Sequence, residues 1–141
     1  MELKEREIIG DYLVGKTLGE GNFGKVKLGT HIAKGKKVAL KFIQHNFRAT
    51  AREIEVVSRE IKILKLLKHP NIVQLLEVIE MPEKKTTVLV LELIEGGDML
   101  NYINGKGGIS EDEAIHLFRQ IISAVEYTHS NLVVHRGTYI T

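Results

Sequence analysis

A glycine-rich hexapeptide constrains the fold of this 141-residue chain more than any other feature. Gly19, Gly21 and Gly24 follow the spacing G-x-G-x-x-G, which more than one class of nucleotide-binding fold shares. In a dinucleotide-binding fold these glycines open a helix, and an acidic residue follows about twenty positions later. Here Gly24 leads into the alternating pattern of a strand, and Gln44 stands at the later position. The dinucleotide interpretation therefore fails on two counts.

A glycine hairpin can serve a different chemistry. Main-chain N–H groups can approach a polyphosphate closely there, because no Cβ atom stands in the way. An ordinary hairpin turn explains the same six residues without any ligand. The motif alone leaves both interpretations open.

Short apolar segments separated by turn residues predict a mixed α+β fold with a five-stranded antiparallel sheet. Three strands are expected between residues 12 and 43, joined by the glycine hexapeptide and by a basic turn at residues 34–37. Two more strands are expected over residues 72–79 and 87–93, separated by a polar turn at residues 82–85.

Helical patterns occupy the remaining segments. A capping box at residues 50–53 opens the first helix, which His69-Pro70 ends. Residues 99–103 are expected to form a short helix, and a second capping box, Ser110 with Glu113, opens the longest one. One face of this last helix is an apolar stripe, which consists of Ala114, Leu117, Phe118, Ile121, Ile122 and Val125.

The third strand carries a candidate functional lysine. Ala39 and Lys41 are two residues apart and share one face of the strand, so the small residue leaves room for a flat ring beside the lysine. A lysine in an apolar strand also occurs simply at a sheet edge with its amine in water. Lys41 alone does not decide between these interpretations.

Glu60, on the first expected helix, favours the functional interpretation of Lys41. Its neighbours three and four positions away are apolar, namely Val56, Val57, Ile63 and Leu64. Glu60 is therefore either solvated or paired with a distant partner. A Lys41–Glu60 pair would hold the amine where it contacts nucleotide phosphates, which is positional and electrostatic catalysis.

These features stand in one order with one set of spacings, and together with His135-Arg136 they are highly specific. The chain resembles the N-terminal portion of protein serine/threonine kinases, closest to the AMP-activated and sucrose-non-fermenting kinase group. The resemblance covers about residues 10–136. The phrases that carry it are Leu18 to Val26, Ser58-Arg59-Glu60-Ile61, His69 to Val73, and Glu95-Gly96-Gly97-Asp98.

The resemblance implies an organisation into three parts and a set of site residues. Residues 1–11 would be an N-terminal extension, 12–95 the ATP-binding lobe, and 96–141 the truncated start of the second lobe. The implied adenine and ribose contacts are Leu18, Val26 and Ala39 as a roof, Leu91 as gatekeeper, the main chain of Glu92 and Ile94, and Asp98. Leu64, Leu75 and His135 would belong to an internal hydrophobic stack.

Two of these residues have simpler explanations. Leu91 is equally compatible with core packing, and Asp98 with a turn residue after two glycines. Both alternatives stay open at this point.

The family pattern breaks at Gly137. Protein kinases have an aspartate after His-Arg that receives the substrate hydroxyl proton, and an asparagine that holds Mg²⁺ follows it. Here Gly137 occupies the aspartate position, and residues 138–141 include no carboxylate or amide. The 141-residue chain is therefore expected to be inactive and to bind ATP weakly. A frame change, an alternative splice, a truncated gene model and a pseudokinase-like binding or interaction fragment all remain open explanations.

Composition narrows the classes of partner and compartment. The net charge of +2 is spread along the chain, so nucleic-acid binding is not expected. The absence of cysteine excludes disulfides and thiol ligation, and no leader or membrane segment is expected, which suits the cytosol or nucleus. The apolar stripe from Ala114 to Val125 is expected to be exposed and to favour association with a partner kinase, a chaperone or other copies.

Overall fold

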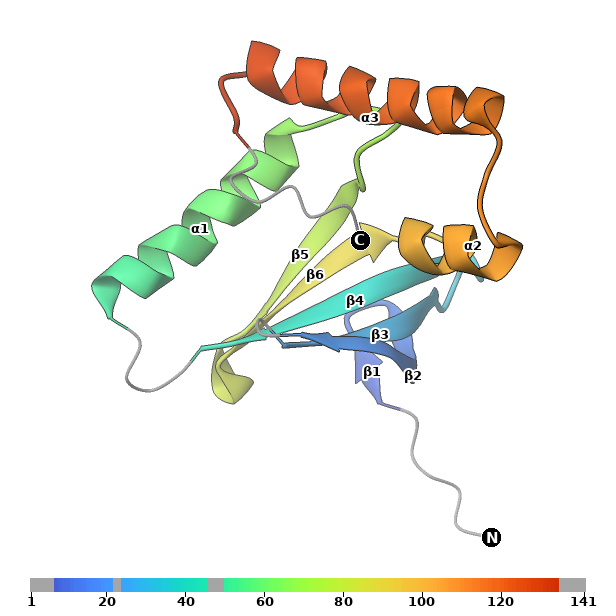
Figure 1. The fold of residues 1–141 in the computed structure, drawn as a ribbon. Helices are drawn as coiled ribbons and strands as arrows, with labels where there is room; N and C mark the ends of the chain where they lie inside the picture. The colour runs from blue at the N-terminus through green and yellow to red at the C-terminus, as the bar shows by residue number, and fades with distance from the viewer. Residues whose placement is uncertain (1–6, 22–23, 46–49, 135–141) are drawn as a thin grey trace, which may run out of the picture. The chain divides into compact units, whose positions relative to one another are not determined.

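The computed structural model describes residues 7–21, 24–45 and 50–134, and it confirms the predicted α+β class. The elements, in chain order, are β1 (Ile8–Ile9), β2 (Tyr12–Gly21), β3 (Gly24–His31), β4 (Lys37–Gln44), α1 (Ala51–Leu66), β5 (Leu75–Met81), a 3₁₀ helix (Pro82–Lys84), β6 (Thr86–Glu92), α2 (Met99–Lys106) and α3 (Glu111–Ser130) (Figure 1). The chain divides into two compact units. The sheet unit comprises Met1–Lys65 and Gln74–Leu93, and the helical unit comprises Leu66–Val73 and Ile94–Thr141.

The strands of the sheet unit form one antiparallel sheet in the order β1-β2-β3-β4-β6-β5. All five predicted strands are present, and the short strand β1 adds a sixth by pairing Ile8 with Leu13. The fourth predicted strand begins three residues later than expected, at Leu75, and has a register shift between Leu75 and Glu77.

The sheet curls until strands that are not neighbours in the ladder come into contact. The Tyr12 hydroxyl on β2 donates a hydrogen bond of 3.1 Å to Glu77 Oε2 on β5. A Cβ atom at Gly10 would lie 3.0 Å from the Ile79 side chain, also on β5. Burial, and secondarily the bond to Glu77, raises the pKa of Tyr12. The two ends of the sheet therefore lie close together.

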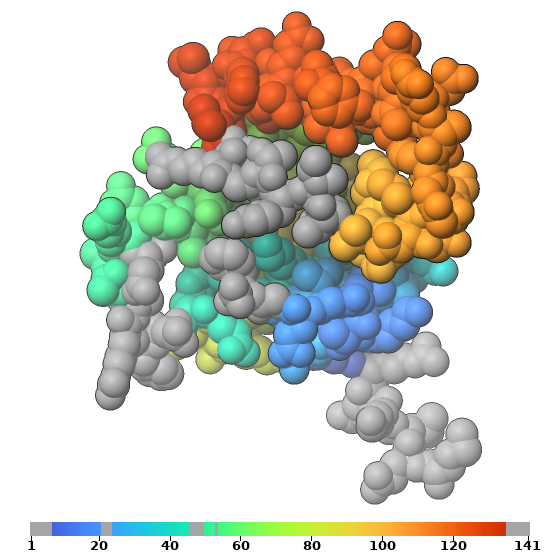
Figure 2. Space-filling model, in the orientation of Figure 1, coloured from blue at the N-terminus to red at the C-terminus, as the bar shows by residue number. Residues whose placement is uncertain are grey.

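The main hydrophobic cluster of the sheet unit lies on one face of the sheet. Alternate residues of the two central strands supply it, because side chains two apart in a strand point the same way. The buried members of this core are Ile9, Tyr12, Val38, Leu40, Val88 and Val90. In the space-filling view, the atoms of β2 to β4 are coloured blue to cyan (Figure 2).

The buried polar residue Thr87 is satisfied within the sheet unit. Its hydroxyl donates to Glu80 Oε2 at 2.6 Å, and its oxygen lies 2.6 Å from Nε2 of His45. Thr87 is only 1% exposed, so leaving its hydroxyl without partners would be costly.

In the helical unit, the segment after α1 is attached to α3. The helix ends at Leu66, three residues before the predicted stop at His69-Pro70. The Lys68 N–H then donates to the Tyr127 hydroxyl at 3.0 Å. Further bonds join His69 to Ser123 at 3.1 Å and Asn71 to Gln120 at 3.2 Å.

The start of α3 corrects one detail of the predicted second capping box. The Ser110 hydroxyl accepts from the Glu113 N–H at 3.2 Å, as a capping box requires. The Glu113 carboxylate does not complete the box, because it accepts from Lys106 Nζ at 2.9 Å and from the Tyr102 hydroxyl, both on α2. These bonds lower the pKa of Glu113 and raise that of Lys106. The predicted cap at Ser110 is therefore confirmed, whereas the Glu113 side chain joins α3 to α2.

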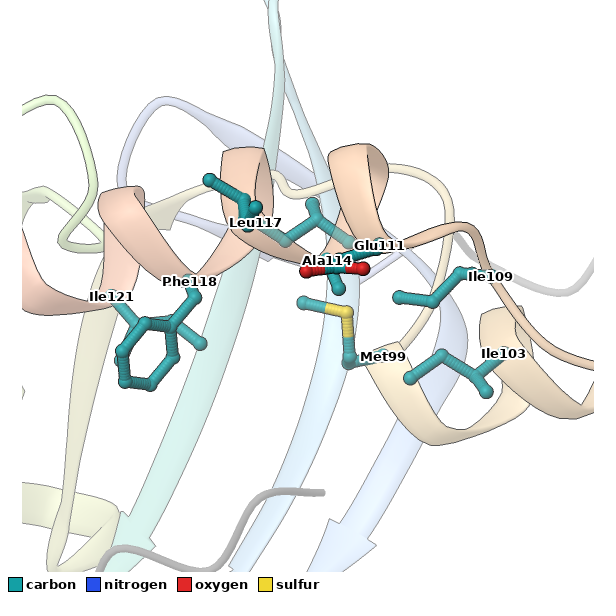
Figure 3. A pocket seen from close by; sticks show the side chains of 9 residues that line it. Met99, Ile103, Ile109, Glu111, Ala114, Leu117, Phe118 and Ile121 are labelled. Carbon is teal, nitrogen blue, oxygen red and sulfur yellow. The ribbon is translucent and has the colours of Figure 1, made fainter.

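An open apolar groove of about 440 Å³ lies between α2 and α3. Figure 3 shows Met99 pointing from α2 toward Ala114 of α3, with Leu117, Phe118 and Ile121 continuing along the same helix. Phe118 is 59% exposed and Ile122 is 48% exposed. The groove therefore includes part of the apolar stripe found in the sequence.

Candidate nucleotide-binding site

The glycine hexapeptide joins β2 to β3. Gly21 pairs with Gly24 and Glu20 with Lys25, so the two strands run almost to the turn. Glu20 and Lys25 also form an exposed ion pair of 3.6 Å. The predicted antiparallel hairpin is present, with Gly21 and Gly24 at the strand ends and Gly19 inside β2.

Two glycines of the motif have different surroundings in the structure. Gly24 has φ of 129°, and a Cβ atom there would lie 1.9 Å from the carbonyl oxygen of Phe42. The fold itself therefore demands glycine at this position. At Gly19 no atom lies within 4 Å of an added Cβ, so the fold has room for a side chain there. The open space at Gly19 is free for the approach of a ligand to the main chain.

The strand registers bring several predicted site residues onto one face of the sheet. Directly paired residues of antiparallel strands share a face. One row across the sheet consists of Gly19, Val26, Lys41 and Leu89. The adjacent row consists of Leu28, Ala39 and Leu91. Val26, Ala39, Lys41 and Leu91 therefore line one face, opposite to the face that carries Val38 and Leu40 of the core.

Lys41 occupies the interior of the sheet. Its strand β4 lies between β3 and β6, which excludes the alternative of a lysine at a sheet edge. The side chain is half-buried, with Val26 and Leu89 as its cross-strand neighbours. A lysine with apolar neighbours on both adjoining strands suits the binding of an anion on this face.

Two other predicted residues are less constrained by the sheet. Glu60 is exposed on α1, and its pairing with Lys41 stays a prediction. Leu18 is 43% exposed and lies at the irregularity between Thr17 and Gly19, so the ladder does not assign it to a face. Its contact with adenine likewise stays a prediction.

The end of β6 carries the residues whose main chain is predicted to bind adenine. Leu91 is half-buried and pairs with Leu75 of β5. Beyond this pair, the Glu92 N–H donates to the Gln74 carbonyl at 3.0 Å, and the Gln74 N–H donates to Glu92 Oε1 at 2.8 Å. Ile94 follows and is 58% exposed.

Asp98 caps the N-terminus of α2. Its Oδ1 accepts from the Asn101 N–H at 2.8 Å, and its Oδ2 accepts from Asn101 Nδ2 at 2.6 Å. The structure thus gives Asp98 a local role as a helix N-cap, which neither the predicted ribose contact nor the simpler explanation of a turn residue had included. A ribose contact by the same carboxylate stays a prediction.

Several expectations fall on residues for which no placement is described. His135, Arg136 and Gly137 lie outside the described residues. Leu64 and Leu75, the other predicted stack members, are half-buried and buried respectively. In the described ranges, no cluster of three or more His, Asp or Glu side chains could hold a metal ion, and none of the helices could span a membrane.

Comparison with known proteins decides the family. Residues 12–137 match the protein kinase domain. The chain belongs to the protein kinase family. Over 129 residues it is 52% identical to the probable serine/threonine-protein kinase MARK-C of Dictyostelium discoideum, and over 130 residues it is 49% identical to the SNF1-related protein kinase catalytic subunit alpha KIN12 of Arabidopsis thaliana. The resemblance to serine/threonine kinases is therefore confirmed.

The two alignments cover different shares of the proteins compared. They include 91% and 92% of this kinase chain, but only 17% and 26% of the two relatives. Protein kinases as a family use ATP with Mg²⁺. The open space at Gly19 and the half-buried Lys41, on one face beside the small Ala39, fit a polyphosphate joined to a flat base.

Sequence reasoning missed the bonds between Gln74 and Glu92. The main-chain pairing continues the ladder of β5 and β6, whereas the side-chain bond has no local signature. Eighteen positions separate the two residues, so no spacing rule connects them. The register of β5 against β6 would have been needed to find this contact.

Proposed function

We propose that this chain supplies the ATP-binding part of a serine/threonine kinase, and that the whole protein transfers the γ-phosphoryl group of ATP to serine or threonine hydroxyls. The observation that carries the proposal is the shared face of Val26, Ala39, Lys41 and Leu91, on which Val26 and Lys41 lie in the same row as the open Gly19. This face has an apolar part for a base and a cation for phosphate.

The residues of this face have separate tasks. Val26 and Ala39 pack on one side of the adenine ring, while Leu91 limits how deep the pocket is. Lys41 holds the phosphates, and Glu60 orients the Lys41 amine. Mg²⁺ neutralises charge on the phosphates in this family. No covalent step involves these residues, because phosphoryl transfer relies on positioning and charge stabilisation.

A methyl group at Gly19 tests the nucleotide site without disturbing the fold. We expect Gly19→Ala to weaken ATP binding by roughly tenfold, or about 1.4 kcal/mol. The free energy of unfolding should change by less than about 0.5 kcal/mol, since the methyl enters open space. Isothermal titration with Mg-ATP and urea unfolding measure the two quantities. Unchanged affinity in a folded Gly19→Ala variant would remove the glycine hairpin from the site.

Phosphoryl transfer by the 141-residue polypeptide itself is a separate matter. In the reaction, the substrate hydroxyl oxygen forms a bond to the γ-phosphorus, the bond to ADP breaks, and the hydroxyl proton passes to an aspartate. Gly137 stands at the position of that aspartate, and the family's metal-binding asparagine and Asp-Phe-Gly segment are not among the 141 residues. Each such element is typically worth about two to three decades in rate.

We therefore expect the isolated polypeptide to transfer no phosphate, and Gly137→Asp not to rescue it. The measurement is incorporation of labelled γ-phosphate into a generic serine/threonine substrate, with Lys41→Met as the background. Reproducible transfer above that background by the unmodified chain or by Gly137→Asp would contradict this expectation.

A further inference from the structure

At the end of the antiparallel ladder between β5 and β6, the pair Gln74 and Glu92 makes only one of the two usual main-chain hydrogen bonds. In a hydrogen-bonded antiparallel pair, each residue donates its N–H to the main-chain carbonyl of the other. Glu92 obeys this rule, because its N–H donates to the Gln74 carbonyl at 3.0 Å. Gln74 does not, because its N–H donates to the Glu92 side chain, at 2.8 Å from Oε1.

The Gln74 N–H donates to the Glu92 side chain instead of to the Glu92 main-chain carbonyl, and this changes the hydrogen bonding of that carbonyl. In an extended strand, the N–H and C=O of one residue point toward the same neighbouring strand. The Glu92 carbonyl is therefore on the side of β5, where Gln74 would be its normal donor. Because the carboxylate takes that donor instead, the carbonyl is left without the bond that would complete the pair.

The local structure favours this exchange. The ladder shifts its register between Leu75 and Glu77, immediately beside the Gln74–Glu92 pair. The Gln74 side chain is also engaged, since its Nε2 donates to the Leu75 carbonyl at 3.1 Å. An ionised carboxylate is a stronger acceptor than a neutral carbonyl, so it competes well for the Gln74 N–H.

We propose that the Glu92 side chain is a positioning residue that keeps the Glu92 carbonyl available for the 6-amino group of adenine. The inference rests on the proposed ATP site, in which the main chain of Glu92 binds the adenine edge. When the Glu92 carboxylate is removed, the Gln74 N–H donates to the Glu92 main-chain carbonyl instead. That carbonyl is then no longer available to accept a hydrogen bond from adenine.

Engagement of the Glu92 carbonyl by Gln74 should change the preference for ATP over GTP, which general destabilisation should not do. The 6-amino group of ATP donates a hydrogen bond, whereas guanine has a carbonyl oxygen at position 6 and cannot donate there. Loss of the Glu92 carbonyl therefore weakens ATP binding but not GTP binding. A merely structural defect would weaken the binding of both nucleotides alike.

The test compares three variants of the full 141-residue chain with the wild type. Glu92→Leu removes the acceptor, and Glu92→Gln keeps an oxygen that can accept from Gln74. Glu95→Leu removes an equal charge from a nearby exposed position. Affinities for Mg-ATP and Mg-GTP are measured by isothermal titration, and thermal unfolding checks that each variant is folded.

We expect Glu92→Leu to lower the ratio of ATP to GTP affinity by about three- to tenfold, the range for one hydrogen bond. Glu92→Gln and Glu95→Leu should keep the wild-type ratio. If Glu92→Leu binds ATP and GTP with the wild-type ratio, or if Glu92→Gln loses it as well, the positioning role is wrong.

Amide hydrogen exchange at Gln74 gives a second readout that needs no nucleotide. We expect the Gln74 amide of Glu92→Leu to stay protected to within about threefold, because the Glu92 carbonyl captures it. Exchange that is tenfold or more faster in Glu92→Leu, but normal in Glu92→Gln, would overturn the capture. If the wild type binds neither nucleotide, the proposed ATP site fails, and this exchange measurement still decides the proposal about the carbonyl.

Discussion

The sheet unit and the helical unit differ in how far their apolar side chains are buried. The central strands of the sheet unit have fully buried residues, such as Leu40 and Val90, each 0% exposed. The helices α2 and α3 contain no buried residue, and Phe118 of α3 is 59% exposed. A curled sheet encloses its own core, whereas two helices joined by a short loop leave one apolar side uncovered in the described part of the chain.

The polar contacts of the two units also differ in burial, with buried contacts in the sheet unit and exposed ones in the helical unit. In the sheet unit, Thr87 is 1% exposed and its hydroxyl has partners on two sides. In the helical unit, Lys106, Tyr102 and Glu113 form an exposed network between α2 and α3. Exposed charge pairs contribute little to stability, so this network is expected to add little to the stability of the helical unit.

A core truncation gives the largest expected difference between the units. Leu40→Ala should lower the free energy of unfolding by about 2–5 kcal/mol, because it removes buried methyl groups and leaves a cavity. Phe118→Ala should cost less than about 1 kcal/mol, since most of the ring is already in water. Urea unfolding, with hydrogen exchange to localise the loss, measures both. Equal losses would show that α3 is packed as tightly as the sheet.

A charge in the groove should change association more than folding. We expect the unmodified chain to self-associate at tens of micromolar through the α2–α3 groove, and Phe118→Asp to reduce this association. His116→Asp is the matched control, because it adds the same charge at another exposed position of α3. Light scattering after size exclusion measures the mass. A monodisperse monomer for the unmodified chain and for Phe118→Asp would mean that the stripe is already covered.

The smallest expected effect is the pH dependence of the α2–α3 network. The bonds from Tyr102 and Lys106 lower the folded-state pKa of Glu113, so its contribution is present above the ordinary glutamate pKa of about 4.3. The contribution is lost as the pH falls through the folded-state value, because protonated Glu113 no longer attracts Lys106.

The matching change is expected at alkaline pH. The bonds to Tyr102 and Glu113 raise the folded-state pKa of Lys106, so its contribution is present below the ordinary lysine pKa of about 10.4 and is lost as the pH rises through the folded value.

Thermal unfolding of the wild type and Glu113→Gln between pH 3 and 7 tests the predicted loss of stability at acid pH, with Glu111→Gln as control. Curves that stay parallel over this interval would exclude the network as a source of pH dependence.

The amino-acid sequence was sufficient to predict the class of fold, the order of five strands and three helices, and the family. Periodicity and capping residues are local signals, so α3 begins where Ser110 predicts, and the five expected strands are present. The element ends were less accurate, since α2 continues to Lys106 and β5 begins at Leu75. Local patterns do not report the contacts that end an element.

The contacts between residues on different strands could not be predicted from the sequence. Strand alternation placed Ala39 and Lys41 on one face, but the registers of β3 and β6 added Val26 and Leu91 to it. The curl that joins Tyr12 to Glu77 and the acceptor that Glu92 offers to Gln74 link residues far apart in the chain. Such contacts depend on how strands twist and align, and that alignment is the sum of many cross-strand contacts rather than a property of any short segment.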